Sequence, residues 1–133
     1  MAVRRALVAS GREAVARALH LSPGVVAGDF VFLTGMTGAL PDGTMPTDPE
    51  AQIRSAFDKI GEVLALDGLD HSAIVEMTSY HVGLRDHFDL FNSIRSAYVH
   101  EPFPAWTAVE VAGLRREGAI VEIRVVAMRV GLA

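Results

Sequence analysis

Glu122 is the residue of this chain best suited to acid–base chemistry. It stands between Val121 and Ile123 in segment 119–130, which is rich in β-branched residues and has the length of a long strand. A carboxylate at this place can hold a water molecule and move a proton, as a general acid–base catalyst does. It can also be a solvated strand residue paired with Arg124, which is the more common situation for strand carboxylates.

Trp106 is the second candidate, in the strand-like segment 103–112. The polar link 114–118 ends in Gly, which predicts a hairpin between this segment and segment 119–130. The register of that hairpin decides whether Trp106 and Glu122 share a face. Trp106 offers one N–H donor, no charge and a large π face, so it suits a flat, weakly acidic or cationic ligand. The alternative is that Trp106 fills a cleft or a subunit interface.

Other chemistries lack the residues that they need. The chain has no Cys, which excludes disulfides, thiolate catalysis and Cys-based zinc sites. No pair of His has a spacing such as His-x-x-x-His, so we expect no metal, and no cofactor is expected either. His81 is interpreted as a strand residue with a local hydrogen bond, whereas His71 and His87 are interpreted as exposed residues at the ends of helices or loops.

Composition limits the partners. The 133 residues suit one domain, 1–133, and the formal net charge of −4 without a Lys/Arg-rich run argues against a nucleic-acid surface. No stretch reaches about 18 apolar residues, and the N-terminus lacks a long apolar segment. We therefore expect no membrane span and no signal peptide, and a cytoplasmic protein.

Two amphipathic helices are predicted. Asp48 is a natural N-cap, followed by Pro49 and by an apolar stripe at helical spacing, and Gly68 closes this helix. Asp86 is predicted to cap the second helix, which Pro102 and Pro104 stop. Strands are predicted at 24–27, 30–34, 73–82, 103–112 and 119–130.

The predicted order is therefore β-β-α-β-α-β-β. A short edge strand at 3–9 fits the sequence, and segment 13–20 fits either a helix or a strand. The fold class that follows is two-layer α+β, a mixed β-sheet with two helices packed on one face. Apolar residues on the other face, at Val126, Met128 and Val130, indicate that an oligomer buries it. Strand 30–34 is apolar almost throughout, which predicts that both of its faces are covered.

Several motifs together resemble the Rid/YjgF family of small trimeric proteins, many of which are imine or enamine deaminases. They are Pro104-Ala105-x-Thr107 with Val109-Glu110-Val111-Ala112, then Val121-Glu122-Ile123, the segment from Ala27 to Gly35, and Asp86-His87-Phe88 with Asn92. The resemblance runs from about Leu21 to Arg129. It implies a chorismate-mutase-like or YjgF-like fold, a homotrimer, and small-molecule sites in the clefts between subunits.

The resemblance also implies roles for single residues. Glu122 stands at the acidic position that holds or activates the attacking water. Four residues match pocket positions of the family: Thr34, Gly35, Asn92 and Thr107. For Asn92 the alternative is a side chain that braces a neighbouring loop.

Two pocket positions depart from the family pattern. Leu21 stands where the family often has Tyr, and Trp106 stands where deaminating members usually carry an Arg that grips the substrate carboxylate. Spacing does not choose among the arginines that could replace it: Arg54, Arg85, Arg115, Arg116 and Arg124.

Three functions follow from the sequence. The first is a hydrolytic deaminase for an imine or enamine other than the usual small 2-imino acid, with Glu122 as the catalytic residue. The second is a non-catalytic trimer that binds a small metabolite. The third, an endoribonuclease, fits least, because RNA cleavage would use a basic groove and this chain is net acidic.

Overall fold

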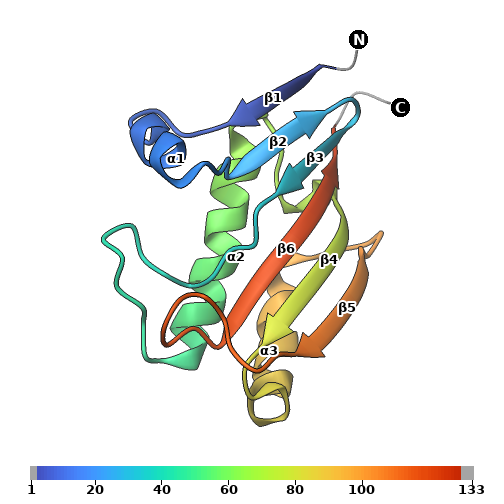
Figure 1. The fold of residues 1–133 in the computed structure, drawn as a ribbon. Helices are drawn as coiled ribbons and strands as arrows, with labels where there is room; N and C mark the ends of the chain where they lie inside the picture. The colour runs from blue at the N-terminus through green and yellow to red at the C-terminus, as the bar shows by residue number, and fades with distance from the viewer. Residues whose placement is uncertain (1–2, 130–133) are drawn as a thin grey trace.

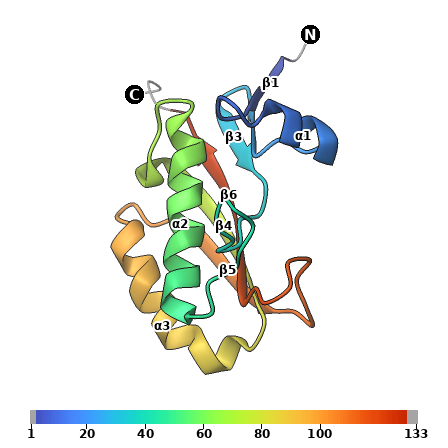
Figure 2. The ribbon, with the colours of Figure 1, turned by 90° about the vertical axis from the view of Figure 1, so that its left-hand side faces the viewer.

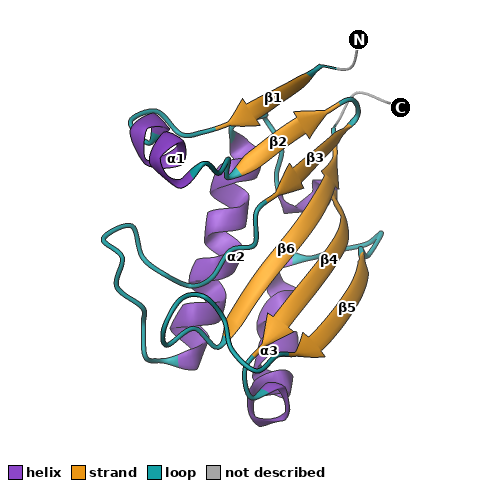
Figure 3. Ribbon diagram, in the orientation of Figure 1, coloured by secondary structure: helices purple, strands orange, loops and turns teal. Residues whose placement is uncertain are grey.

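The computed structural model describes residues 3–129 and contains a six-stranded sheet with three α-helices (Figures 1 and 3). In chain order the elements are β1 Arg4–Leu7, α1 Glu13–Leu19, β2 Gly24–Ala27, β3 Phe30–Leu33, α2 Pro49–Ala65, the 3-10 helix η1 His71–Ala73, β4 Ile74–His81, α3 Leu84–Tyr98, β5 Ala105–Glu110 and β6 Val121–Met128. The predicted two-layer α+β class and the β-β-α-β-α-β-β order are confirmed from β2 onward. The N-terminal segment adds β1 and the short helix α1.

Helix α2 forms as the sequence predicts. The carboxylate of Asp48 accepts a hydrogen bond from the backbone N–H of Ala51 at 3.0 Å, and Pro49 is the first helical residue. The predicted apolar stripe is buried against the sheet, at Ile53, Ala56, Phe57, Ile60, Val63 and Leu64. Figure 2 shows α2 and α3 side by side on one face of the sheet.

The start of helix α3 differs from the prediction. The helix begins at Leu84, and Gly83, in the left-handed conformation with φ +74°, occupies the capping position. Asp86 therefore lies within the first turn, where its charge favours the positive end of the helix dipole, but it does not cap the helix.

The predicted hairpin between the last two strands is wrong. The strand order is β1-β2-β3-β6-β4-β5, so β4 lies between β5 and β6. β5 pairs with β4 in parallel through the α3 crossover, and β6 pairs with β4 antiparallel. The intervening segment 111–120 is too long for a tight turn. Its two ends are held at the end of β4: Val111 N–H donates to the carbonyl of His81, the last residue of β4, and Val82 N–H, the next residue along the chain, donates to the carbonyl of Ile120.

The sheet face opposite α2 and α3 is turned toward the viewer in Figure 3, where none of the three α-helices crosses in front of strands β3 to β6. Phe30, Phe32 and Met128 lie on it and are 38%, 41% and 40% exposed, so β3 is not covered on both faces within one chain. We call this the open face. Val130, which was predicted to extend the apolar row, lies outside the described residues. None of the helices in the described part of the chain combines the length and apolar character needed to cross a membrane.

A buried amide fixes the start of β6. The side chain of Gln52, on α2, donates to the carbonyls of Pro46 and Gly118 at 2.8 Å each and accepts from Ile120 N–H at 3.0 Å. Gln52 is 2% exposed, so losing it would leave several backbone groups buried without partners. The helix thereby sets where the strand that carries Glu122 begins. The apolar stripe did not predict this role, since Gln52 is polar.

Candidate functional site

Glu122 lies half-buried on the open face, opposite Tyr80 of the neighbouring strand β4. Burial alternates along β6: Val121, Ile123, Val125 and Ala127 face the helices, and Glu122 faces away from them. The suggested pairing with Arg124 is not formed, because Arg124 lies 3.9 Å from Glu76 instead. The carboxylate of Glu122 therefore does not form an ion pair with Arg124, the cation on its own strand.

Gly35 makes room for this carboxylate. A Cβ atom built on Gly35 would lie 2.8 Å from Cδ of Glu122 and closer still to one carboxylate oxygen. The next residue, Met36, exchanges backbone hydrogen bonds with Ile123 at 2.8 and 2.9 Å, which fixes the two segments side by side. The absence of a side chain at residue 35 thus sets the position of Glu122.

We expect Gly35→Ala to lower the free energy of unfolding by about 1 kcal/mol, the low end of the range for overpacking, because the added methyl group collides with the flexible end of the Glu122 side chain, which can shift. Urea unfolding measures this loss. In a Glu122→Ala background the same substitution should cost little, since the colliding atoms are gone. Equal costs in the two backgrounds would contradict the close approach.

Thr34 and Leu21 belong to the segments beside Gly35. The hydroxyl of Thr34 donates to the carbonyl of Ser22 at 2.7 Å, and the backbone N–H of Thr34 donates to the carbonyl of Pro23 at 2.9 Å. The hydroxyl therefore ties the segment after Leu21 to the end of β3. Leu21 is 39% exposed. Thr107, on β5, is also on the open face. It pairs with Thr78 of β4, which pairs in turn with Arg124 of β6, so β4 lies between Thr107 and the strand that carries Glu122.

Trp106 and Asn92 lie on the other side of the sheet. Trp106 pairs with Met77, which pairs in turn with the buried Val125, so the indole faces helix α3 and Glu122 faces away from it. Its ring is stacked on Phe88 with centroids 5.8 Å apart and an angle of 4°. The sequence left open whether Trp106 and Glu122 share a face, and in the structure they lie on opposite faces of the sheet.

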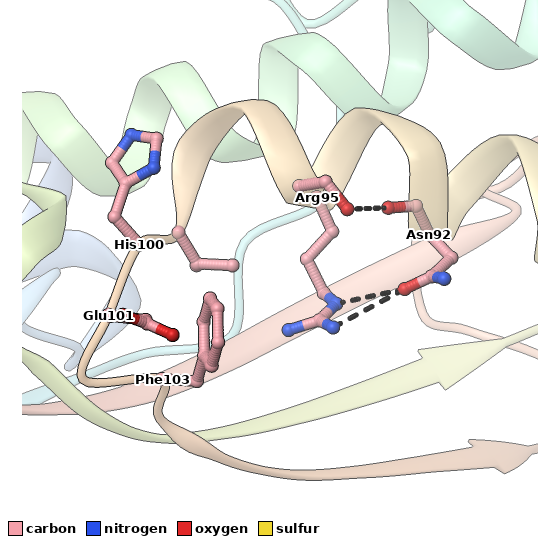
Figure 4. Close-up of a pocket in the computed structure, with 7 residues that line it drawn as sticks. Asn92, Arg95, His100, Glu101 and Phe103 are labelled. Carbon is pink, nitrogen blue, oxygen red and sulfur yellow. Dashed lines mark hydrogen bonds between the residues drawn. The ribbon is translucent and has the colours of Figure 1, made fainter.

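Arg95 is a residue that the sequence analysis missed. Its guanidinium carbon lies 3.8 Å from the centroid of the Trp106 ring, and its Nε and Nη2 donate to Oδ1 of Asn92 at 3.4 and 3.3 Å (Figure 4). Asn92 therefore binds Arg95, three residues further along the same helix, and not a neighbouring loop as the alternative for it predicted. The sequence analysis predicted the helix that carries Arg95 but assigned no role to this residue.

A hydrogen-bonded chain runs beneath Trp106. The indole N–H donates to Oγ of Ser79 at 2.9 Å, Ser79 lies 2.8 Å from Nε2 of His81, and Nδ1 of His81 lies 3.1 Å from Nε2 of His87. Burial, with a smaller effect of His87, lowers the pKa of His81 to about 4, and burial also lowers that of His87. The local hydrogen bond of His81 is confirmed, but the exposure predicted for His87 is wrong, since it is 9% exposed.

Comparisons with known proteins agree with this architecture. A family model described as endoribonuclease L-PSP matches residues 11–129. The RutC family protein YjgH of Escherichia coli is 32% identical over 128 residues, 96% of this chain and 96% of that protein. A solved structure of protein YjgH has a TM-score of 0.85 and 31% identity, covering 95% of this chain and 96% of that one. The chloroplastic reactive intermediate deaminase A of Arabidopsis thaliana is 32% identical over 109 residues, 80% of this chain and 58% of that protein.

Proposed function

The chain belongs to the endoribonuclease L-PSP family and is similar to a reactive intermediate deaminase, and on that basis we propose that it is a hydrolytic deaminase acting on an imine or enamine. The observation that carries the proposal is the position of Glu122. Its carboxylate is half-buried, lies against the bare Cα of Gly35 and is not paired with Arg124. A carboxylate held in this way can accept a proton from a bound water.

The proposed reaction has two steps. In the first step Glu122 accepts a proton from water as the water oxygen adds to the imine carbon, and it passes a proton to the imine nitrogen, so that a carbinolamine forms. In the second step Glu122 accepts the proton of the carbinolamine hydroxyl and passes a proton to the amino nitrogen, the carbon–nitrogen bond breaks, and ammonia leaves as the carbonyl forms. Glu122 carries a proton in both steps and ends unprotonated, so the net reaction is imine plus water to carbonyl plus ammonia.

We propose a substrate without a carboxylate, because β5 carries Trp106 at the position where a cation could bind one. Trp106 has no charge, and its indole packs toward α3, away from the face that carries Glu122. Arg124, the cation next to Glu122 along β6, lies 3.9 Å from Glu76. An uncharged imine therefore suits the open face better than a 2-imino acid does.

We include a homotrimer and a cytoplasmic location in the proposal. The number of subunits is what the resemblance to the Rid/YjgF family implies. Apolar residues at the β3–β6 end of the open face support an assembly, since Phe30, Phe32 and Met128 would leave water on association. Glu122 would then lie near a boundary between subunits. Sedimentation at micromolar concentration measures the mass, and a monomer would contradict a site completed by a neighbouring subunit.

The test of the activity is ammonia release. Imines generated in situ from amino acids and from simple amines are followed with and without the protein. Faster release confined to uncharged imines would support the proposal as stated, whereas release from 2-imino acids would mean that another group binds the carboxylate. No acceleration on any imine would favour the second candidate, a trimer that binds a small metabolite without turning it over.

A further inference from the structure

A hollow of about 350 Å³ lies beside helix α2, where the loop that follows β3 and the segment before α1 approach that helix. Most of its wall is apolar, and this part includes Pro23, Met36, Ala39, Leu40, Val63 and Leu66. Leu40 and Leu66 are each 41% exposed, so apolar surface inside the hollow is open to a ligand. Apolar walls with a few charged groups are typical of small-molecule sites of this size.

The hollow lies on the helix side of the sheet. Met36, which lines it, forms a bridge with Ile123 of β6, and Ile123 is buried toward the helices. Side chains that lie opposite each other on paired strands point to the same face, so Met36 points away from the open face. Glu122, the neighbour of Ile123, points to that open face. A ligand in the hollow is therefore separate from the proposed deaminase site.

The charged groups of the hollow are unequal in number. Three cations line it, Arg12, Lys59 and Arg116, against the single carboxylate of Glu62. The ion pairs formed among residues 3–129 use other cations, so none of these three is neutralised by a carboxylate there. An excess of two positive charges is left around an apolar wall, although the whole chain has a formal net charge of −4.

Lys59 is the best-ordered of the three cations. Its Nζ donates to the backbone carbonyls of Thr37 and Ala39 at 2.8 and 3.0 Å, and an ammonium has three N–H groups, so one is left for a ligand. Burial and, after it, the charge of Arg116 lower the pKa of Lys59, and Glu62 opposes this. An anion between Lys59 and Arg116 would therefore relieve a repulsion as well as accept a hydrogen bond.

We propose that this hollow binds a phosphate monoester with a small apolar body. The phosphate carries close to two negative charges at neutral pH, which matches the excess of positive charge, and it would lie between Lys59 and Arg116. Lysine binds phosphate as a point charge, and arginine adds directed N–H donors. The body would lie against Leu40, Val63 and Leu66. A carboxylate would neutralise only half of the excess.

Hexyl phosphate is the probe that tests this chemistry. In isothermal titration calorimetry at pH 7.5 we expect a Kd of about 0.1–1 mM. Inorganic phosphate lacks the apolar body and 1-hexanol lacks the charge, so each should bind at least about tenfold more weakly. Heptanoate has a body of similar length but one negative charge, and it should also bind more weakly than hexyl phosphate.

Two methionines show where the probe binds. Met36 lines the hollow, whereas Met77 of β4 is 1% exposed and packs in the core. In NMR spectra of protein with labelled Met methyl groups, hexyl phosphate should shift the Met36 signal saturably and leave the Met77 signal in place. Met36→Leu and Met77→Leu assign the two signals.

Substitutions of the charged residues test their roles. Arg116→Gln should weaken hexyl phosphate binding by about threefold and Lys59→Met by about tenfold, whereas Glu62→Gln should tighten it by about twofold. Lys59→Met also removes two hydrogen bonds to the loop, so Arg116→Gln keeps the test independent of loop structure.

Arg54→Gln is the matched control. Arg54 is on the same helix, is paired with Glu50 at 3.0 Å and lies outside the hollow, so the same change of charge should leave binding unaltered. Far-UV circular dichroism confirms that each variant is folded. The proposal is overturned if hexyl phosphate does not bind, if heptanoate or inorganic phosphate binds equally well, or if Arg54→Gln and Arg116→Gln have equal effects.

Discussion

Glu122→Gln should slow ammonia release from the preferred imine by about 10²- to 10⁴-fold, the range by which a positioned proton-transfer group accelerates a reaction. The substitution keeps the shape of the side chain, so the close approach to Gly35 is preserved. It removes the function assigned to the carboxylate, which is to accept and pass on a proton in both steps of the reaction. The measurement is the initial rate of ammonia release under saturating imine.

Glu76→Gln is a matched control for this loss. Glu76 lies on the neighbouring strand β4, and its carboxylate is 3.9 Å from Arg124 and 58% exposed. Its loss should change the rate by less than about twofold, since exposed ion pairs contribute little. Equal losses in the two variants would indicate an effect of the overall charge of the sheet. An unchanged rate in Glu122→Gln would remove Glu122 from the mechanism.

The second large effect concerns stability in acid. His81 is fully buried, and its folded-state pKa is lowered to about 4 from an ordinary value of 6.5, chiefly by burial. Between these values the unfolded chain binds a proton at this residue and the folded chain does not, so stability falls as the pH falls. The contribution is complete above pH 6.5, and about 3 kcal/mol of it is lost on going down to pH 4. Urea unfolding at fixed protein concentration measures the change.

His81→Gln is the variant that separates this residue from the other titrating groups. It removes the imidazole, so the variant should lose less stability than the unmodified protein between pH 6.5 and 4. The lowered pKa of His87 acts in the same direction and remains in the variant. Asp67, whose pKa is lowered below 3.8 by its hydrogen bond to Arg129, loses its stabilising effect only at still lower pH. Identical slopes in both proteins would contradict the assignment to His81.

Local signals in the sequence predicted the elements well. Helix α2 is the clearest case: its N-terminus is capped by Asp48, it begins at Pro49, and the apolar stripe that follows is buried. Both the cap and the stripe depend only on residues within a few helical turns. The strands were also predicted within a few residues, because β-branched runs bounded by Gly and Pro need little tertiary information. The Gly83 start of α3 was missed, since a left-handed Gly leaves no side-chain signal.

Pairing between strands could not be predicted in the same way. Segments 103–112 and 119–130 are neighbours in sequence, but β4 lies between them in the sheet. A parallel pair such as β4–β5 is made by a crossover helix, so which strands meet depends on where α3 packs. That packing also decided the contacts of Trp106.

The motifs and their order were enough to identify the family, and periodicity was enough to predict the two-layer fold and a strand that carries Glu122. The face that each side chain occupies, and what lies against it, could be read only from the folded chain. It put Glu122 against Gly35 on the open face and Trp106 beneath Arg95 on the face toward α3. The physical reason is that each strand side chain points to one of two faces, and pairing with distant strands fixes which one.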